Sequence, residues 1–332
     1  MTLFLILLGL TVTWVIVAIL LIATQRVIPP SQVDDDGPFD FDPDSERYQE
    51  PTQPLQHYKA PDGTELGYRH YSCQQDDAPL LIFIHGSTNY GGLYEPLAKM
   101  IAASGAADVV LPDMRGHGPK LHDRGIANYV GQLEDDIATL IQQVKKEGQK
   151  LIIGGHSLGG GFAIRFASGK HGRKVDEAFL LAPYLNTRAP TNRPNAGGFV
   201  RVLYRRALGL AMLGVPKLFG LFRLPVVQFN FSQAYRRFDR SWLSTDQYNF
   251  AMTMGFGPRQ QWAADVKKLP PFLMVIGEKD EVFFADQYQN CMSALTDKGH
   301  YQVLPGVNHI DASMDPATVA TFKQFVDRRQ AD

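Results

Sequence analysis

Residues 151–160 read Leu151-Ile152-Ile153-Gly154-Gly155-His156-Ser157-Leu158-Gly159-Gly160. The first four form an apolar run typical of a buried parallel strand, and apolar residues recur at helical spacing after Leu158. Gly-x-Ser-x-Gly lies between them, where a tight strand-to-helix turn would hold Ser157 in a strained backbone conformation. The glycines on both sides lack a Cβ, so the strand and the helix can pass close together. This context predicts an exposed nucleophilic serine at a strand tip and disfavours a serine in an ordinary glycine-rich turn.

A nucleophilic serine needs a base and an acid to activate it. His309 is the predicted base, because it follows the last expected strand and so lies at the same sheet edge as Ser157. The acid that orients the imidazole is expected in the loop after the preceding strand, where three carboxylates compete. Asp280 has the position that the arrangement requires, and Glu278 and Glu281 are the alternatives.

Acyl transfer also requires hydrogen-bond donors for a developing negative oxygen. The first buried strand ends in a glycine-containing loop, His85-Gly86-Ser87-Thr88-Asn89-Tyr90-Gly91-Gly92. The backbone N–H groups of Ser87 and Leu158 can converge on that oxygen, and loss of one such donor costs about 3 kcal/mol of barrier. The loop 113–118 is expected to brace this region, and His156 is interpreted as a packing residue of the turn.

Composition limits the partners and cofactors of the chain. A formal net charge of -1, without a run of Lys or Arg, gives no reason to expect nucleic acid as a partner. The two cysteines, Cys73 and Cys291, are too few for a disulfide framework. No Cys/His cluster has metal-ligand spacing, so neither a metal nor another cofactor is expected.

The N-terminus is predicted to be a single-pass membrane anchor. Residues 3–23 carry no charge, and a helix of 21 residues extends roughly 31 Å, which is enough to cross a bilayer core. The stretch is too long for the apolar region of a signal peptide, and no basic residue precedes it. Arg26 follows the stretch and favours a cytoplasmic domain, whereas a glycosylation sequon at Asn230 favours the opposite side. The sequon carries less weight than Arg26, so a cytoplasmic domain is favoured although the side of the membrane is not decided.

Residues 28–50 are predicted to be an extended, solvated tether. They contain four prolines and eight acidic residues against a single basic residue, Arg47. Such a segment would let the following domain stand off an anionic membrane surface or swivel on it.

The folded domain is expected over residues 55–332. A hairpin at 57–68 is followed by alternating helices and strands, with strands at 80–84, 109–111, 151–154, 178–181, 272–276 and 302–304. This alternation predicts a mostly parallel, doubly wound α/β sheet whose ligands lie at the carboxyl ends of the strands.

One insertion, residues 186–262, breaks the alternation and is predicted to be a helical cap. It is rich in large apolar side chains and has eleven Lys or Arg against two Asp. Either the cap lies against anionic lipid headgroups, or it packs its apolar side on the main domain and solvates its arginines. The second interpretation is favoured, and one cap can satisfy both.

These motifs together resemble the α/β-hydrolase superfamily, in particular its monoacylglycerol lipase and lysophospholipase-like branch. The resemblance rests on five motifs in their order along the chain: His85-Gly86, Asp113-x-Arg115-Gly116-His117-Gly118, Gly155-x-Ser157-x-Gly159-Gly160, Gly277-x-x-Asp280 and Val307-x-His309. The chain order of Ser157, Asp280 and His309 is also that of α/β-hydrolase triads. Residues 87–89 and Pro119 depart from the usual pattern of the branch, so the resemblance leaves the acyl chain and the head group open.

The predicted function is hydrolysis of carboxylic esters of hydrophobic or lipid-like substrates through an acyl-enzyme. An acyltransferase would use the same acyl-enzyme and differ only in the acceptor. A membrane-tethered binding module without activity is the third possibility, and the intact set of Ser157, Asp280 and His309 argues against it.

Overall fold

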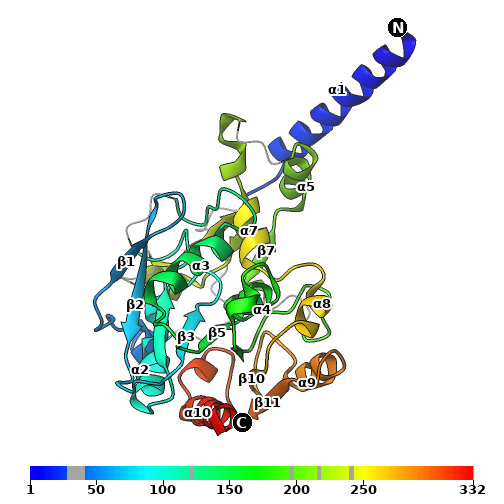
Figure 1. Cartoon of the computed structure of the whole chain (residues 1–332). Coiled ribbons are helices and arrows are strands. Elements are labelled where there is room, and N and C mark those ends of the chain that lie inside the picture. Colours follow the sequence, from blue (N-terminus) through cyan, green and yellow to red (C-terminus); the bar gives the residue numbers. More distant parts are fainter. Residues whose placement is uncertain (28–41, 120–122, 194–197, 215–217, 239–242, 332) are drawn as a thin grey trace.

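An eight-stranded sheet forms the centre of the molecule (Figure 1). The computed structural model describes residues 1–27, 42–119, 123–193, 198–214, 218–238 and 243–331. The strand order is β1-β2-β4-β3-β5-β6-β10-β11. The bounds of these strands are β1 Gln56–Lys59, β2 Glu65–Tyr71, β3 Leu80–Ile84, β4 Asp108–Pro112, β5 Leu151–His156, β6 Glu177–Leu181, β10 Phe272–Gly277 and β11 Gly299–Leu304.

Helices and short 3₁₀ turns connect the strands. The α-helices are α1 Thr2–Ala23, α2 Glu95–Ala103, α3 Gln132–Val144, α4 Leu158–Ser168, α5 Tyr204–Met212, α6 Gln233–Arg237, α7 Phe250–Phe256, α8 Trp262–Lys267, α9 Ala285–Ser293 and α10 Pro316–Ala331. The 3₁₀ turns are η2 Glu46–Tyr48, η3 Gly91–Tyr94, η4 Gly172–Lys174, η6 Leu218–Arg223 and η8 Asp311–Ser313.

Most of the sheet is parallel, which confirms the predicted fold class. β1 pairs antiparallel with β2, and β2 pairs antiparallel with β4. The other neighbouring strands of this sheet run parallel to one another. β3 and β5 are buried along their whole length, because helices cover both faces of a parallel sheet.

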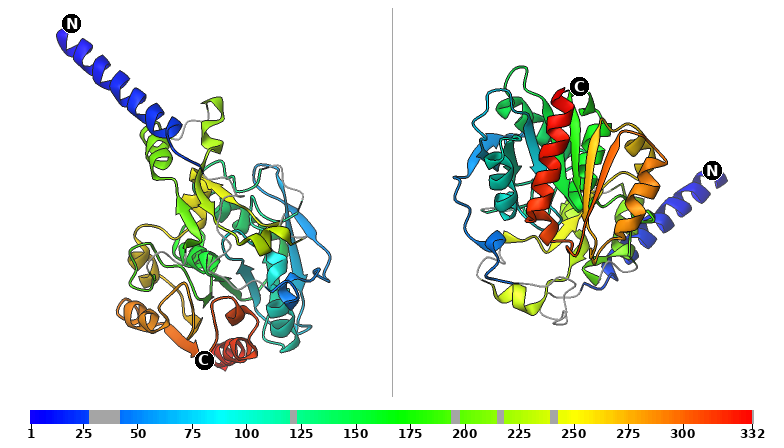
Figure 2. Two further views of the ribbon diagram at one scale, coloured as in Figure 1. Left: turned by 180° about the vertical axis from the view of Figure 1, so that it is seen from behind. Right: turned by 90° about the horizontal axis from the view of Figure 1, so that it is seen from below.

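The two faces of the sheet pack against different helices. In β3, Leu80, Ile82 and Ile84 join the core cluster that contains side chains of α3 and α4. Leu81 and Phe83 join the cluster that contains side chains of α2 and α10. Successive side chains of a strand point to opposite faces, so one strand supplies both cores. Figure 2 shows α10 lying across its face of the sheet.

The segment between β6 and β10 forms the cap, and it is not purely helical. Besides α5 to α8 it carries a separate antiparallel sheet of β7 Val200–Val202, β8 Pro225–Phe229 and β9 Gln247–Asn249. The prediction of a helical cap is therefore incomplete. The three strands are short and pair with one another, so they add no β-α alternation to the sequence. Residues 194–197, 215–217 and 239–242 of the predicted cap lie outside the described residues.

The predicted anchor forms a single helix, α1. In the part of the chain that the structure describes, α1 is the one helix long and apolar enough to cross a bilayer, by length and composition. It lies beside α5 of the cap in both Figure 1 and Figure 2.

Part of the predicted tether is packed on the body. Its residues 28–41 lie outside the described residues. In η2, however, Arg47 is only 3% exposed, and the ring of Tyr48 lies 5.5 Å from that of Phe238 in the cap. The backbone N–H of Thr52 then donates to the carboxylate of Glu95 in α2. The expected solvated segment is thus wrong for Arg47 and Tyr48, because an aromatic ring and a long aliphatic stem gain from burial even in an acidic segment.

Candidate active site

Ser157 occupies the predicted turn between β5 and α4. Its φ of 55° and ψ of -119° are a conformation that an L residue adopts only at a cost in free energy. A Cβ on Gly155 would lie 2.5 Å from the carbonyl group of Gly159, and a Cβ on Gly159 would lie 2.3 Å from the carbonyl oxygen of Ile84. Both positions therefore require glycine. Ser157 and Leu158 are half-buried, whereas β5 is buried throughout.

The structure brings Asp280 and His309 into direct contact. Asp280 is fully buried, and its Oδ2 accepts a hydrogen bond from His309 Nδ1 at 2.7 Å. The other carboxylate oxygen, Oδ1, accepts from the backbone N–H groups of Val282 and Phe283. Because Nδ1 is the donor, Nε2 of His309 is the ring atom that can accept a proton.

The two alternative acids bind backbone groups of the same loop. Glu281 Oε2 accepts from the N–H of His309 at 2.9 Å, and Glu278 Oε2 accepts from the N–H of Gly306 at 2.8 Å. Of the three carboxylates, Asp280 is the one bonded to the imidazole. The other two hold the loop that carries it.

A series of hydrogen bonds through Tyr94 and His156 connects three loops. The N–H of Gly86 donates to Tyr94 Oη at 3.0 Å, and the Tyr94 hydroxyl donates to His156 Nδ1 at 2.9 Å. His156 Nε2 then donates to the carbonyl oxygen of His309 at 3.0 Å. Burial lowers the pKa of His156 well below its ordinary value, and the neighbouring His309 adds to this effect, so the ring is neutral. The interpretation of His156 as a packing residue misses this role, and no sequence motif marks Tyr94.

The loop that carries one proposed oxyanion donor is fixed by the cap. Ser87 follows β3, and the adjacent Thr88 donates its N–H to Tyr248 Oη at 2.8 Å. That hydroxyl donates to His117 Nε2 at 2.7 Å, and burial lowers the pKa of His117 to about 4, so the ring accepts as a neutral imidazole. Leu158, the other proposed donor, is the first residue of α4, so its N–H has no acceptor within the helix.

The loop after β4 braces this region, as predicted. Arg115 donates from Nε and Nη2 to both carboxylate oxygens of Asp136, at 2.7 and 2.9 Å. Asp113 Oδ1 accepts from the N–H of Gly91 at 2.8 Å and so fixes the end of the loop after β3. Burial raises the pKa of Asp113 to about 6, against the opposing charge of Arg69. These side chains hold the neighbouring loops in place and are not part of the proposed triad.

A buried cation, Arg47, lies beside these loops. Its guanidinium is 5.3 Å from the centre of the Tyr48 ring, and its charge contributes to the lowered pKa of His156. Among the described residues, Arg47 Nε and Nη1 have no hydrogen-bond acceptor. Composition assigns this arginine to a solvated tether, and no local pattern in the sequence places it here.

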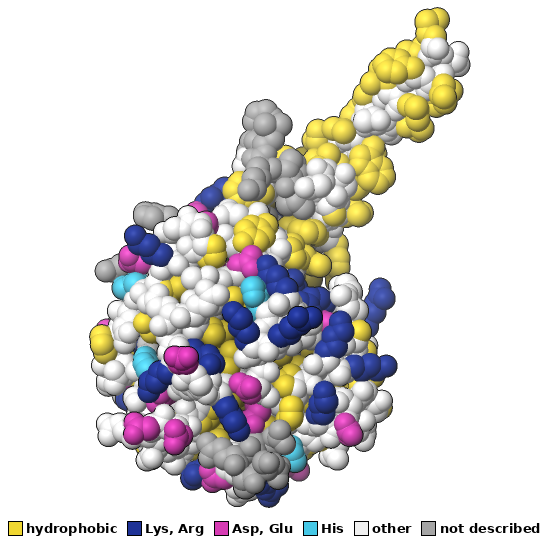
Figure 3. All heavy atoms as spheres, viewed as in Figure 1, with side chains coloured by type: hydrophobic (Ala, Val, Ile, Leu, Met, Phe, Trp, Pro, Cys, Tyr) yellow, Lys and Arg dark blue, Asp and Glu magenta, His cyan; other side chains and the backbone are white. Residues whose placement is uncertain are grey.

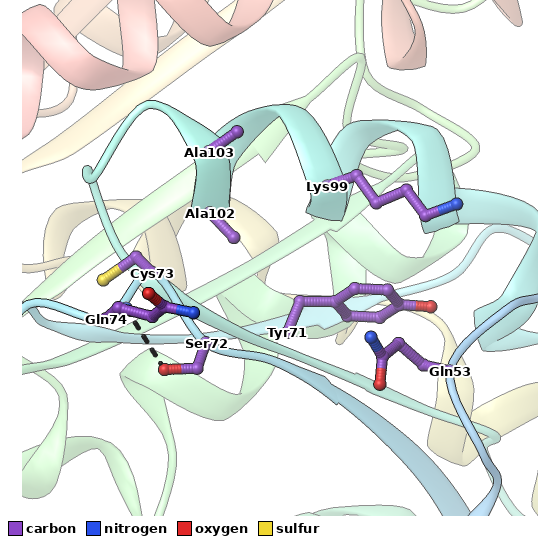
Figure 4. A pocket seen from close by; sticks show the side chains of 8 residues that line it. All are labelled: Gln53, Tyr71, Ser72, Cys73, Gln74, Lys99, Ala102 and Ala103. Atoms are coloured by element: carbon purple, nitrogen blue, oxygen red, sulfur yellow. Dashed lines mark hydrogen bonds between the residues drawn. The ribbon is translucent and has the colours of Figure 1, made fainter.

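A surface hollow of about 390 Å³ lies between the end of β2 and α2 (Figure 4). Tyr71, Cys73 and Lys99 contribute to its lining, and it shares no residue with the predicted site. Within the described ranges, no group of three or more His, Cys, Asp or Glu side chains could hold a metal ion.

The sheet order and the serine at the tip of β5 define an α/β-hydrolase fold. Residues 75–310, more than half of the chain, match the family model described as serine aminopeptidase, S33. The chain belongs to this hydrolase family.

Known proteins resemble the chain in part. It is 33% identical over 119 residues to 2-(acetamidomethylene)succinate hydrolase of Mesorhizobium japonicum, which is 35% of this chain and 40% of that protein. It is 27% identical over 164 residues to human monoglyceride lipase, 49% of this chain and 52% of the lipase. The matches thus span about half of these relatives or less.

A solved structure agrees over more of the chain. A soluble variant of monoglyceride lipase from Saccharomyces cerevisiae, in complex with a substrate analog, superposes with a TM-score of 0.63. The superposition covers 84% of this chain and 96% of that one, at 17% identity. This likeness shows the fold.

Proposed function

We propose that the protein is a membrane-anchored serine hydrolase that cleaves carboxylic esters of hydrophobic or lipid-like molecules. Ser157 is the nucleophile, His309 the base and Asp280 the acid that orients the base. The observation that carries the proposal is the 2.7 Å bond from His309 Nδ1 to a fully buried carboxylate, at the sheet edge where β5 ends. The strained backbone of Ser157 and the family of the chain support it further.

In the first half of the proposed reaction, Ser157 Oγ attacks the carbonyl carbon of the ester while His309 Nε2 takes the hydroxyl proton. Asp280 holds the tautomer in which Nε2 carries no hydrogen, and it stabilises the imidazolium that forms. The backbone N–H groups of Ser87 and Leu158 donate to the oxygen on which negative charge develops.

In the second half, the bond to the leaving oxygen breaks and His309 returns its proton to the departing alcohol. A water molecule then attacks the acyl-enzyme, and His309 takes the proton of that water. The bond between the acyl carbon and Ser157 Oγ then breaks, His309 returns its proton to Oγ, and the carboxylic acid is released.

The hydrophobic substrate class and the membrane location are parts of the proposal. The apolar helix α1 and the likeness to a monoglyceride lipase support them. A catalytic domain held at a bilayer by α1 would meet its substrates at the concentration that they have in the membrane.

The test uses the full-length protein in detergent, a fluorophosphonate probe and a panel of esters of increasing acyl length. We expect Ser157→Ala to lose both labelling and turnover. Ser168 lies at the C-terminal end of α4, the helix that follows Ser157, and Ser168→Ala should keep both. Labelling that persists in Ser157→Ala would exclude the proposed nucleophile. Glycerol added as a competing acceptor separates hydrolysis from acyl transfer, and an aminoacyl anilide tests amide cleavage.

A further inference from the structure

α1 and α5 are antiparallel neighbours in contact from one end of α5 to the other. At the N-terminal end of α5, the backbone N–H of Arg205 donates to Gln25 Oε1 at 3.1 Å, and its guanidinium donates to Thr24 Oγ1 at 2.6 Å. At the C-terminal end, the carbonyl oxygen of Met212 accepts from Trp14 Nε1 at 3.0 Å. The register between the two helices is therefore defined at both ends.

The two helices approach most closely at a glycine. A Cβ on Gly209 would lie 2.6 Å from the carbonyl oxygen of Ala18 and 2.8 Å from the side chain of Ile22. Ala18 is fully buried, although most of α1 is exposed. Small residues that let two backbones approach are the typical contact between helices in a bilayer.

The register fixes how far α5 extends along α1. Ten residues separate Trp14 from Thr24, and a rise of about 1.5 Å per residue makes this distance about 15 Å. A bilayer core is about 30 Å thick. With Thr24 at the boundary where the apolar stretch of α1 ends, Met212 lies near the middle of the bilayer.

The side chains of α5 suit this position. Residues 207–214 carry no charge, and Leu208 is 55% exposed. After α1, nine large hydrophobic side chains are exposed in the described part of the chain. Four of the nine lie within nine residues of one another: Val200 and Val202 in β7, and Tyr204 and Leu208 in α5. In Figure 3, hydrophobic side chains cover α1 and continue toward the body, where the Lys and Arg side chains lie.

The bond between Trp14 and Met212 satisfies two polar groups that hydrocarbon would leave unpaired. The last carbonyl groups of a helix have no donor within the helix, and an unpaired polar group in a bilayer core costs several kcal/mol. The indole N–H of Trp14 faces the same requirement in the middle of its apolar helix. In water either group would find a partner without the other.

Arginines of the cap are engaged with the protein itself. Arg223, Arg236 and Arg259 pair with carboxylates, and Arg193 donates to backbone carbonyls of the loop that contains Asp280. The contacts of Arg193, Arg223 and Arg259 join the cap to the body, whereas Arg236 pairs with Asp246 within the cap. The apolar helix α5, and not the basic charge of the cap, is therefore the surface best suited to a membrane.

We propose that α5 is a second membrane element, which inserts into one leaflet beside α1 and is covered there by lipid acyl chains. This inference rests on the membrane span by α1 in the proposed function. Tyr204 and Arg205 then lie at the headgroup boundary, where aromatic and basic side chains are favourable. The cap is then held in the leaflet at α5 and bonded to the body before and after α5, at Arg193 and Thr245.

The test reconstitutes the full-length protein in phosphatidylcholine vesicles that carry a photoreactive diazirine at the end of one acyl chain. Adducts are mapped by mass spectrometry. We expect adducts on α1 and on α5, at Leu208 or Ala211, and none on α9 of the body. Adducts on α1 without adducts on α5 would overturn this inference and leave the membrane span standing. Adducts on neither helix would overturn both the insertion of α5 and the membrane span by α1.

A pair of variants tests the contact with α1. In Gly209→Val the new side chain would meet the backbone at Ala18, so we expect the adducts on α5 to be lost and those on α1 to remain. Ala211→Val, on the exposed side of the same helix, should keep both sets. Unchanged adducts on α5 in Gly209→Val would show that insertion does not need α1, and the proposed pairing would be wrong. Hydrolysis of a short soluble ester reports whether each variant is folded.

Discussion

The catalytic loops and the cap are held in place by different means. Hydrogen bonds between buried groups join the loops around Ser157, as in the contacts of Tyr94 and His156. The cap is bonded to the body at both ends, where Arg193 donates to the carbonyl of Asp280 and the N–H of Thr245 donates to the carbonyl of Thr88, and between them it contacts α1 through α5. The body therefore positions the proposed triad, and the cap helps to fix the loop of Ser87, whereas the body and helix α1 together position the cap.

The largest effect is expected inside the loops, from Asp280→Asn. The amide oxygen would take over the bonds to the N–H groups of Val282 and Phe283, so the amide NH₂ would face His309 Nδ1. The imidazole would then carry its hydrogen on Nε2 and could not take the serine proton. We expect kcat for a short ester to fall by about 10⁴-fold.

Glu281→Gln is the matched control, because an amide oxygen can still accept from the N–H of His309. It should keep kcat close to that of the unmodified protein. If Glu281→Gln lost as much activity as Asp280→Asn, the two carboxylates would share the role assigned to Asp280.

A smaller effect is expected where the loops are joined to one another. Tyr94→Phe removes the hydroxyl that bonds both Gly86 and His156. Two buried polar groups lose their partner, at a cost of about 1–3 kcal/mol in unfolding free energy, and kcat should fall with it. Tyr301→Phe is the comparison, because the Tyr301 hydroxyl is buried without a partner in the described structure. If urea titrations gave equal losses of unfolding free energy for the two substitutions, this would argue against the role of Tyr94 in joining Gly86 and His156.

The last effect is expected where the cap meets the loops, and it appears only as the pH falls below neutral. Burial lowers the pKa of His117 from 6.5 to about 4, so the unfolded chain binds more protons between these values. Stability is then lost as pH falls from 6.5 to 4, by about 3 kcal/mol from this group. His117→Gln should show a flatter fall in melting temperature across that range. The lowered pKa of His156 does not depend on His117, and His117 contributes to the lowered pKa of His85, so its replacement can only flatten the fall further. Identical slopes would contradict the assignment.

The fold could be predicted because its strands are continuous apolar runs. Residues 80–84 and 151–155 are buried on both faces, and burial on both faces favours an apolar residue or glycine at every position. Among Glu278, Asp280 and Glu281, Asp280 could be proposed as the acid from its position in the loop after β10. What the sequence does not contain is the direction of each side chain, which decides that one carboxylate meets a ring and two meet backbone groups.

The contacts that were missed join residues far apart in the chain. Trp14 and Met212 are 198 positions apart, and neither stands in a motif. The three strands of the cap are too short for a period of two to stand out. Arg47 lies in an acidic, proline-containing segment whose composition predicts solvation, and its burial depends on surfaces formed by other segments.

The buried end of the predicted tether changes what that segment can do. The chain between α1 and η2 is fixed at both ends, at α5 through α1 and at the body through Arg47 and Tyr48. Lengthening a connection whose two ends are held costs little, about 0.6 kcal/mol for each doubling of its length. In the proposed membrane arrangement, residues inserted into this connection would therefore leave the position of the domain relative to the bilayer unchanged. The distance from the lipid to Ser157 would then depend on the contacts of α1 with α5 and of η2 with the body, and not on the number of residues in the linker.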